Sequence, residues 1–257
     1  MSAGDLVGVV LAAGFGTRLR PLTDLVPKAL CPVANEPLVD GAIRRCRAAT
    51  RAIAANAHAH ADQMVAHLSR HHPDVHVSVE RDEALGTAGA LGHLREWIGG
   101  RDVLVHNADS WLDADASPFV DGWDGERIRL LVVQRADRAP DVGPWTFAGV
   151  SLIPGHMAEP LEPVPSGLWQ VLFRDAVEDG RVDFVEHAGA WFDCGTPSTY
   201  LAANLAASGG ASVIGDGARV EGEVVRSVVW PGAVVGEGER LVECIRTRDG
   251  VTVEAPQ

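Results

Sequence analysis

The sequence lacks the features that would tie the chain to a membrane, to secretion or to disulfide bonds. It contains no apolar run of about 18 residues, the length that crosses a bilayer. Residues 1–5 carry no basic side chain ahead of the first apolar run, so we expect no signal peptide. The four cysteines show no C-x-x-C spacing, and we expect reduced thiols in a cytoplasmic protein.

Positive charge is also scarce. The chain carries 22 lysine and arginine residues against 35 aspartate and glutamate residues, which gives a formal net charge of −13. Proteins that bind nucleic acid rely on an extended cationic surface, so we do not expect a nucleic-acid partner. A chain of 257 residues can form one large domain with a sizeable core and a small appendage.

The stretch at residues 7–28 predicts a phosphate site. The apolar run Val7–Leu11 predicts a strand buried on both faces. It leads into the glycine-rich turn at residues 13–16, where few side chains surround backbone amides that can converge on an anion. Arg18 and Lys28 then supply cations. A strand, an amide-lined turn and cations together predict a site for a nucleoside triphosphate.

Two other phosphate-binding motifs are absent. Gly14 and Gly16 give the G-x-G of a dinucleotide fingerprint, but Leu19 stands in place of the third glycine, and no clear acidic residue follows about 20 positions on. The chain has no G-K-S or G-K-T run for a Walker A loop. The remaining alternative is a plain connector with surface cations, but Pro21 and Pro27 favour a long, shaped loop.

The wording of this stretch resembles a known family. The run L-A-A-G-F-G-T-R-L-R-P-L-T-D and the later P-K-A-L-C-P-V-A-N-E-P-L-V resemble the signature of sugar-1-phosphate nucleotidyltransferases, and are similar to the mannose-1-phosphate guanylyltransferase branch. The resemblance implies that Arg18 and Lys28 bind phosphates. It also implies backbone contacts with the nucleotide from Leu11, Ala12, Gly14, Gly16 and Thr17.

The expected fold is an α/β domain over residues 1–208. Helical and strand patterns alternate between residues 38 and 80, a βαβαβ order that predicts a mainly parallel sheet. Ligands of such sheets bind at the carboxyl ends of the strands. The resemblance implies a Rossmann-like mixed sheet with helices on both faces, of the nucleotide-diphospho-sugar transferase type.

A second glycine-containing loop lies at residues 85–91, L-G-T-A-G-A-L, at the start of a predicted helix. A helix cap could by itself explain Thr87. The resemblance implies instead that Gly86 and Thr87 belong to the loop that reads the base, in wording similar to the guanylyltransferase branch. Larger uridylyl- and thymidylyltransferases often carry a glutamine just before this loop, where this chain has Asp82 and Glu83.

Two aspartates are candidate metal ligands. Asp109 follows the predicted strand at residues 103–106, and a carboxylate in the ligand crevice is costly unless it meets a cation. Mg²⁺ is the natural cation beside a triphosphate. The alternative is that Asp109 is an ordinary surface aspartate. The resemblance places Asp193, in W-x-D-x-G-T-P, as the second ligand, with Trp191 near the sugar. Ala108 replaces the glycine that the family has before the first aspartate.

The sugar half of the site is less well specified. Residues 147–150, F-A-G-V, resemble the family's F-x-G-V segment, so Gly149 contacts the sugar or forms a β-bulge. The lysine of the family's E-K-P motif is missing, and Glu162-Pro163 is the nearest match. The histidines between residues 58 and 76 have no second ligand cluster at zinc spacing, so we expect no metal role for them.

The last segment, residues 209–257, has a different character. Aliphatic residues and glycines recur about every six positions, which predicts a short left-handed parallel β-helix. About three coils are marginal for an independent solenoid, so we expect it to lean on the catalytic domain or on another subunit, as in a homodimer. No histidine follows His187, which excludes an acyltransferase activity of the hexapeptide-repeat type.

The predicted activity is Mg²⁺-dependent condensation of a nucleoside triphosphate with a hexose 1-phosphate. GTP and a mannose-1-phosphate-like sugar are favoured, and the predicted catalytic residues are Arg18, Lys28 and Asp109. One alternative is uridylyl transfer to an amino-sugar or muramic acid 1-phosphate. Another is a non-catalytic subunit that binds nucleotide sugars.

Overall fold

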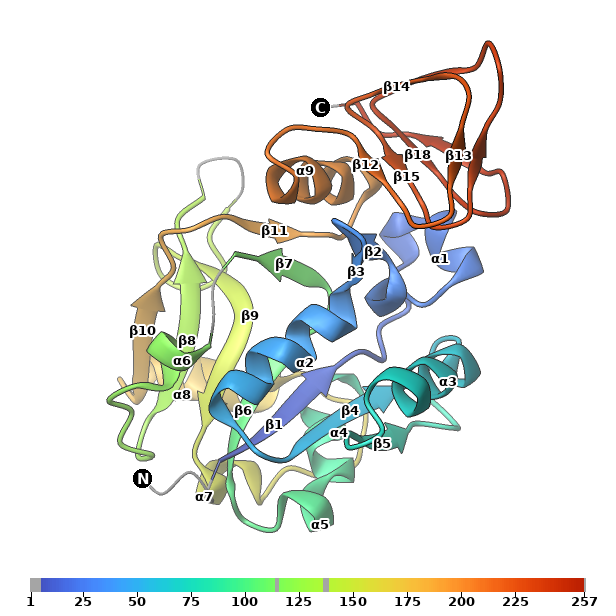
Figure 1. Ribbon diagram of the computed structural model, residues 1–257. Helices are drawn as coiled ribbons and strands as arrows, with labels where there is room; N and C mark the ends of the chain where they lie inside the picture. Colours follow the sequence, from blue (N-terminus) through green and yellow to red (C-terminus); the bar gives the residue numbers. More distant parts are fainter. Residues whose placement is uncertain (1–5, 114–115, 136–138, 257) are drawn as a thin grey trace. The chain divides into compact units, whose positions relative to one another are not determined.

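The computed structural model describes residues 6–113, 116–135 and 139–256, which divide into two compact units (Figure 1). We call the first the sheet unit; it comprises the chain up to Phe15 with residues 42–108 and 114–189. We call the second the repeat unit; it comprises residues 16–41, 109–113 and 190 onward. Each is described by itself.

The sheet unit is built on one mixed sheet with the strand order β10-β8-β9-β6-β1-β4-β5. Its strands are β1 Leu6–Leu11, β4 Ile53–Ala57, β5 His76–Val79, β6 Asp102–Asn107, β8 Ile128–Val133, β9 Thr146–Ile153 and β10 Val182–Glu186. Neighbouring strands are parallel except β9, which runs antiparallel to β6 and β8. The predicted mainly parallel sheet is confirmed.

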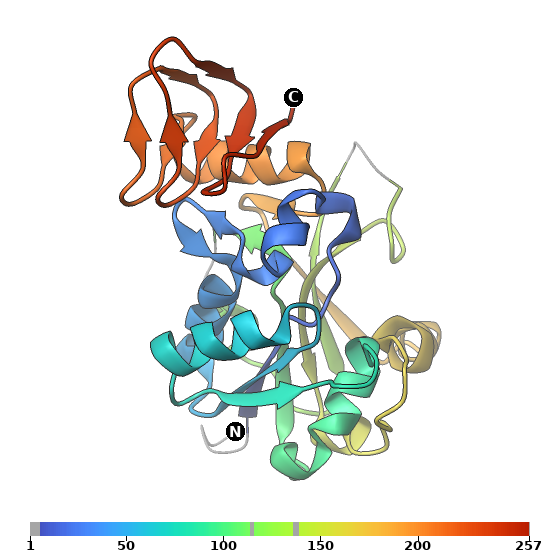
Figure 2. The ribbon, with the colours of Figure 1, turned by 90° about the vertical axis from the view of Figure 1, so that its right-hand side faces the viewer.

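Helices cover both faces of this sheet (Figures 1 and 2). The part of α2 (Leu38–Ala49) from Ala42 on and α3 (Ala61–His71) lie on one face. The other face carries α4 Gly86–His93, α5 Arg95–Ile98, α7 Gly155–Ala158, a π-helical turn Trp169–Phe173 and α8 Arg174–Glu178, whose buried residues share one core cluster with the strands. The unit also contains the short helix α6 Ser117–Val120.

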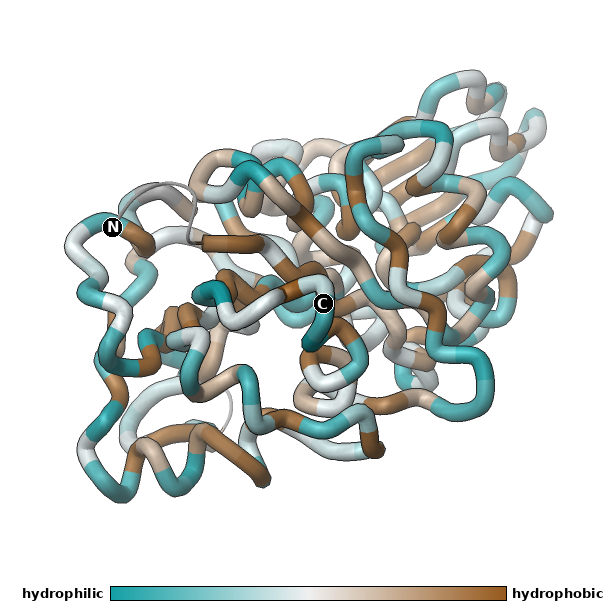
Figure 3. The backbone as a smooth tube through the Cα atoms, turned by 90° about the horizontal axis from the view of Figure 1, so that it is seen from below, coloured by the Kyte–Doolittle hydropathy of each residue, from teal (hydrophilic) through white to brown (hydrophobic). Residues whose placement is uncertain are grey.

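The alternation of side chains along each strand explains the two covered faces. Val7 and Val9 of β1 point into a core that also holds Leu91 of α4. Gly8 faces the opposite way, toward α2, and an added Cβ would lie 3.1 Å from Cys46 Cβ. Gly8 therefore allows α2 to pack closely on the strand. Figure 3 shows hydrophobic stretches along the central strands and hydrophilic residues in many of the outer turns.

The repeat unit combines the C-terminal strands with part of the signature loop, which is the family-like segment at residues 11–39. Its helical segments are the 3-10 turns Thr17–Leu19 and Lys28–Leu30, with α1 Leu22–Leu25 and α9 Pro197–Ala207. Its first strands are β2 Pro32–Val33, β3 Glu36–Pro37, β7 Ser110–Leu112 and β11 Trp191–Asp193. The remaining strands are β12 Val213–Ile214, β13 Arg219–Val220, β14 Glu223–Val225, β15 Val228–Val229, β16 Val234–Val235, β17 Arg240–Val242, β18 Cys244–Arg246 and β19 Thr252–Glu254.

The C-terminal strands form three small sheets. The parallel pairs are β12–β15, β15–β18, β13–β16 and β14–β17, while β19 pairs antiparallel with β18. Their apolar residues share a core with the signature loop, because Val228 and Trp230 belong to the same buried cluster as Leu19 and Cys31. The C-terminal segment thus leans on the segment that carries Lys28.

Helix lengths are also informative. Among the described residues, every helix is too short or too polar to cross a membrane. The π-helical turn Trp169–Phe173 continues directly into α8.

Candidate functional site

Two cations and two carboxylates meet in the repeat unit, and we call them the charged cluster: Arg18, Lys28, Asp109 and Asp193. Lys28 Nζ lies 3.2 Å from Asp109 Oδ2 and 3.7 Å from Asp193 Oδ1. Arg18 Nη2 lies 3.6 Å from Asp193 Oδ2. The Lys28 side chain is 8% exposed, whereas that of Asp109 is 51% exposed and that of Asp193 is 28% exposed. The carboxylates therefore remain open to a ligand.

A short ladder brings the two aspartates together. β7 and β11 are antiparallel, with Ser110 opposite Asp193, so Asp109 stands just before the residue that faces Asp193. The N–H of Cys194 donates to the Asp109 carbonyl at 3.1 Å and fixes the end of the ladder. At Gly195, an added Cβ would lie 2.8 Å from both Arg18 Nη2 and Asp193 Oδ1. A side chain there would push the ion pair apart.

Gly16 holds the signature loop against Lys28. Its φ of +60° is in the left-handed region that favours glycine, and an added Cβ would lie 2.9 Å from Lys28 Cβ. The Thr23 hydroxyl donates to the Gly16 carbonyl at 2.9 Å. Thr17 is exposed at the start of the 3-10 turn that carries Arg18. Of the predicted residues in this unit, Trp191 is buried in β11, opposite Leu112.

The buried thiols beside the cluster are not nucleophiles. Burial raises the pKa of Cys31 to about 12, against a smaller lowering by the nearby Lys28 ammonium. Burial likewise raises the pKa of Cys194, which is fully buried. Both thiols stay protonated at neutral pH, and only the thiolate is reactive. Cys194 therefore serves as a small apolar side chain of the core.

In the sheet unit, the backbone at residues 11–15, which we call the opening loop, is held by hydrogen bonds to a side chain and to the neighbouring strand. The Ala12 N–H donates to Asn56 Oδ1 at 2.6 Å, so this amide serves the fold itself. The Leu11 carbonyl accepts from the Ala108 N–H at 2.9 Å. Gly14 is exposed, and an added Cβ there would meet nothing within 4 Å. Of the predicted loop residues here, Gly14 is therefore the one open to a ligand.

The second loop is closed by a distant segment. Gly86 has a φ of +71°, and an added Cβ would lie 2.5 Å from the Ser166 carbonyl oxygen. The same carbonyl accepts from the Ala88 N–H at 3.0 Å, which occupies one amide of the α4 start. The Thr87 hydroxyl accepts from the Leu168 N–H at 2.8 Å, and α4 has no side-chain cap. Thr87 is therefore no helix cap; it ties the loop to Leu168.

A cavity of about 430 Å³ opens in the sheet unit beside this loop. It is lined by Thr87, Val105, Asn107, Asp141, Phe147, Ser151, Leu168, Trp169 and Phe173. Gly149, between Phe147 and Ser151 on β9, has a φ of +84°, and the register with β8 shifts between Leu130 and Val132. The strand pairing is therefore irregular next to Gly149, in the place where a β-bulge was one of the two expectations. The mixture of aromatic walls and a few polar groups is typical of ligand pockets.

The sequence analysis missed a buried polar pair in this unit. Asn56 and Glu80 are each 3% exposed, and Asn56 Nδ2 donates to Glu80 Oε1 at 2.7 Å. Their signal was available, because both are polar residues at the ends of apolar strand patterns. Nothing in the spacing indicated that the two side chains face each other.

The comparisons with known proteins agree with this geometry. A model of the nucleotidyl transferase family matches residues 7–139, a little more than half of the chain. The chain belongs to the nucleotidyl transferase family. It is 32% identical to an N-acetylmuramate alpha-1-phosphate uridylyltransferase from Caulobacter vibrioides, over 79% of this chain and 97% of that protein. The predictions of the family and of an enzyme of this class are confirmed.

Other relatives are named for the transfer of other nucleotidyl groups. The chain is 28% identical to a mannose-1-phosphate guanyltransferase from Aspergillus fumigatus, over 75% of this chain and 62% of that protein. Among solved structures, a putative glucose-1-phosphate thymidylyltransferase from Bacillus anthracis matches with a TM-score of 0.63 at 20% identity, over 79% of this chain and 95% of that one. This last likeness shows the fold alone.

Enzymes of this family typically use a divalent metal ion, and the charged cluster fits one. Asp109 and Asp193 carry carboxylate oxygens, the type of ligand that Mg²⁺ prefers. Both carboxylates are partly exposed and already share one cationic partner, the Lys28 ammonium. The donor set is thus suited to a cation that also binds phosphate oxygens.

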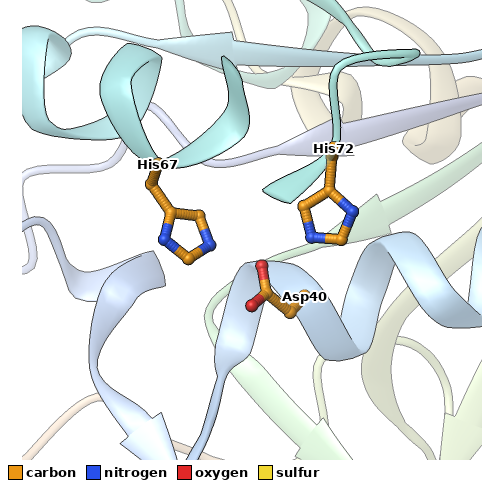
Figure 4. Close-up of side chains that lie close together, drawn as sticks. All are labelled: Asp40, His67 and His72. Carbon is orange, nitrogen blue, oxygen red and sulfur yellow. The ribbon is translucent and has the colours of Figure 1, made fainter. Parts of the chain in front are cut away.

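A pair of histidines lies elsewhere, in the sheet unit. His67 of α3 and His72, just after α3, have ring centroids 6.2 Å apart (Figure 4). Arg47 Nη1 lies 3.1 Å from His72 Nδ1, so this nitrogen accepts a hydrogen bond. Asp40, also drawn in Figure 4, is in the first turn of α2 and belongs to the repeat unit.

Proposed function

We propose that this chain transfers a nucleotidyl group from a nucleoside triphosphate to a sugar 1-phosphate, releasing pyrophosphate. The charged cluster carries this proposal, because two cations beside two open carboxylates suit a triphosphate and its metal ion. The family relationship supports the same reaction.

In this reaction a phosphate oxygen of the sugar 1-phosphate attacks the α-phosphorus, in line with the departing pyrophosphate. Arg18 and Lys28 neutralise phosphate charge, and positioning supplies most of the acceleration. Lys28 is held by its two aspartate partners, which keep its ammonium directed at the cluster. No general base is needed, because the attacking phosphate is already ionised at neutral pH.

Asp109 and Asp193 would hold Mg²⁺, which supplies charge neutralisation for the phosphates and the leaving group. Their half-open carboxylates are the support for this assignment. For the nucleotide, we assign backbone contacts to Gly14, Gly16 and Thr17. The other residues predicted for substrate binding are Leu11, Ala12, Gly86, Thr87, Gly149 and Trp191, and these roles stay proposals.

The cavity of the sheet unit is the proposed sugar pocket. Asn107 and Phe147 line it, and Gly149 lies on the strand between two of its lining residues. Aromatic faces suit the apolar side of a pyranose, while Thr87, Asn107 and Ser151 offer groups for its hydroxyls. The cation that replaces the E-K-P lysine is not assigned to this pocket.

The sequence predicts GTP as the nucleoside triphosphate, with UTP as the alternative. The relative that the chain matches over 97% of its length is a uridylyltransferase of N-acetylmuramate 1-phosphate. The guanyltransferase relative is covered over 62% of its length. We therefore propose UTP with an amino-sugar or muramic acid 1-phosphate as the better supported pair, and GTP with mannose 1-phosphate as the second.

For residues 209–257 we propose a short left-handed β-helix that follows the catalytic domain and forms a homodimer. The parallel ladders β12–β15, β13–β16 and β14–β17 support the coil arrangement. The exposed valines Val220, Val234 and Val242 support an association surface on it. Sedimentation should then give a dimer for the wild type and a monomer for Val242→Glu. The cytoplasmic location stays a prediction.

Pyrophosphate release tests the proposed activity. UTP, GTP, TTP and ATP are each combined with glucose, mannose, N-acetylglucosamine and N-acetylmuramate 1-phosphates, with and without Mg²⁺. We expect turnover for one base and one sugar class, and loss of turnover without the metal. No release from any pair would refute the proposal, and release with GTP and mannose 1-phosphate alone would restore the first prediction.

A further inference from the structure

Glu80 is a buried carboxylate that the proposed chemistry does not use. It follows β5 directly and is 3% exposed. Its Oε1 accepts from Asn56 Nδ2 at 2.7 Å, and its Oε2 accepts from the Leu85 N–H at 2.8 Å. Both donors are uncharged. Burying a carboxylate on uncharged partners carries a large desolvation cost.

The bonds of Glu80 join two loops that are far apart in sequence. Asn56 Oδ1 accepts from the Ala12 N–H of the opening loop at 2.6 Å. Leu85 is the residue from which α4 and the second loop begin. An unbroken chain of hydrogen bonds therefore runs from Ala12 through Asn56 and Glu80 to Leu85.

A second tie joins the same elements. His58 Nδ1 lies 2.7 Å from the Glu80 carbonyl oxygen, which can only accept, so this nitrogen carries a proton. The His58 ring meets Phe15 of the opening loop edge to face, at a centroid distance of 5.2 Å. Glu80 thus anchors the opening loop through its backbone as well as through its side chain.

We propose that Asn56 and Glu80 are positioning residues that set the spacing of the opening loop and the second loop for a nucleoside triphosphate. This rests on the proposed function, in which both loops hold the nucleotide. Neither side chain contacts the nucleotide, because both are buried and their polar atoms already serve Ala12 and Leu85. Their effect is on triphosphate binding rather than on the sugar phosphate.

The donor and acceptor pattern makes this testable by an exchange. Position 56 must accept from Ala12 and donate to position 80, which must accept twice. In Glu80→Gln, the new amide NH₂ group faces another hydrogen-bond donor. In Asn56→Asp, two carboxylates face each other. In the double variant the new carboxylate accepts from Ala12 and from the new amide. The carbonyl of that amide accepts from Leu85, so all three bonds are restored.

The experiment measures UTP and GTP binding to the full chain by calorimetry with Mg²⁺ and no sugar phosphate. Each single variant should raise the Kd of the bound triphosphate by about tenfold or more, as expected when a buried group loses its partner. The double variant should return to within about threefold of wild type. Glu186→Gln, the same change at the exposed end of β10, is the matched control and should bind as wild type.

Steady-state kinetics separate positioning from general loss of structure. The triphosphate KM should rise in the single variants while the sugar-phosphate KM changes less than about twofold. Wild-type Kd in either single variant overturns the inference, as does a double variant that does not fold or bind. If a single variant fails to fold, recovery in the double variant supports the inference. Absence of triphosphate binding by the wild type overturns the proposed function as well.

Discussion

The two units use carboxylates in opposite ways. In the repeat unit, Asp109 and Asp193 are partly exposed and pair with Lys28 and Arg18. In the sheet unit, Glu80 is buried and accepts hydrogen bonds from uncharged amides. The first arrangement leaves lone pairs for a cation and for ligand charge. In the second arrangement, the carboxylate oxygens already accept from one side-chain amide and one backbone amide.

This difference predicts which kinetic parameter changes when each kind of carboxylate is replaced. Loss of a charge that faces the reacting phosphates raises the barrier, because that contact strengthens as charge develops. Loss of a buried anchor shifts the loops and weakens binding of one substrate. Variants of the charged cluster should therefore change turnover, and variants of Asn56 and Glu80 should change the triphosphate KM.

The largest effect is expected at the aspartates. Asp109→Asn and Asp193→Asn each remove one charge from the proposed metal site, and kcat/KM should fall by at least about a hundredfold. Pyrophosphate release measures this, with Asp24→Asn as control, because Asp24 pairs with the exposed Arg20 in the same unit. Near-wild-type turnover in both variants would remove the distinction between the two kinds of carboxylate.

A smaller effect is expected at Lys28. Its side chain is almost fully buried between two carboxylates, so Lys28→Ala leaves them facing each other without their ammonium partner. We expect kcat/KM to drop by about thirtyfold, with a raised triphosphate KM and a lower kcat. Arg20→Ala, an exposed cation of the same loop, should change neither. Unchanged kinetics for Lys28→Ala would show that the loop is only a connector.

The charged cluster was predictable because its residues lie in recognisable sequence motifs. Lys28, Asp109 and Asp193 lie in three separate motifs, and the structure brings them within 3.2 and 3.7 Å. The alternation of apolar residues likewise predicted the strands of the sheet. It did not predict that β9 runs antiparallel, because periodicity reports which residues are buried and not the direction of the neighbouring strand.

The buried contacts were not predictable for a related reason. Thr87 was weighed as a helix cap, yet its hydroxyl accepts from Leu168, 81 residues away. Asn56 and Glu80 looked like polar strand ends, and only the three-dimensional structure shows that they face each other. Side-chain partners across such separations depend on packing, which a pattern within one segment does not contain.

Tyr200 of α9 links the signature loop to the C-terminal strands, and this link should contribute to stability. The Tyr200 hydroxyl donates to the Pro32 carbonyl and accepts from Trp230 Nε1 at 3.0 Å. Tyr200→Phe leaves both buried partners unpaired, and the free energy of unfolding should fall by about 1–3 kcal/mol. Urea denaturation measures this. Glu223→Gln, at an exposed ion pair with Arg240, should cost less than about 1 kcal/mol.

The kinetic outcome of the same variant sharpens the comparison between the units. Tyr200 supports the loop through the Pro32 carbonyl and does not face the phosphates. The folded Tyr200→Phe enzyme should therefore keep its kcat/KM within about threefold of wild type. An unchanged free energy of unfolding would contradict the structural role, and a large loss of kcat/KM would place Tyr200 in the catalytic machinery.

The smallest effect compares one buried thiol from each unit. Burial raises the pKa of Cys31 and of Cys46 from 9.0 to about 12. Below pH 9 each thiol is protonated in both folded and unfolded states. As the pH rises from 9 toward 12, the unfolded thiol ionises while the folded one stays protonated, so stability falls. Each thiol should cost about 1 kcal/mol by pH 10.

Urea denaturation at pH 8 and pH 10 measures this slope. Cys31→Ala and Cys46→Ala should each make the loss of stability between these pH values smaller by a similar amount, because both thiols are fully buried. A smaller slope in only one variant would mean that one unit opens before the other, so that its thiol titrates ahead of global unfolding. Equal slopes in wild type and both variants would show that neither thiol remains protonated by burial.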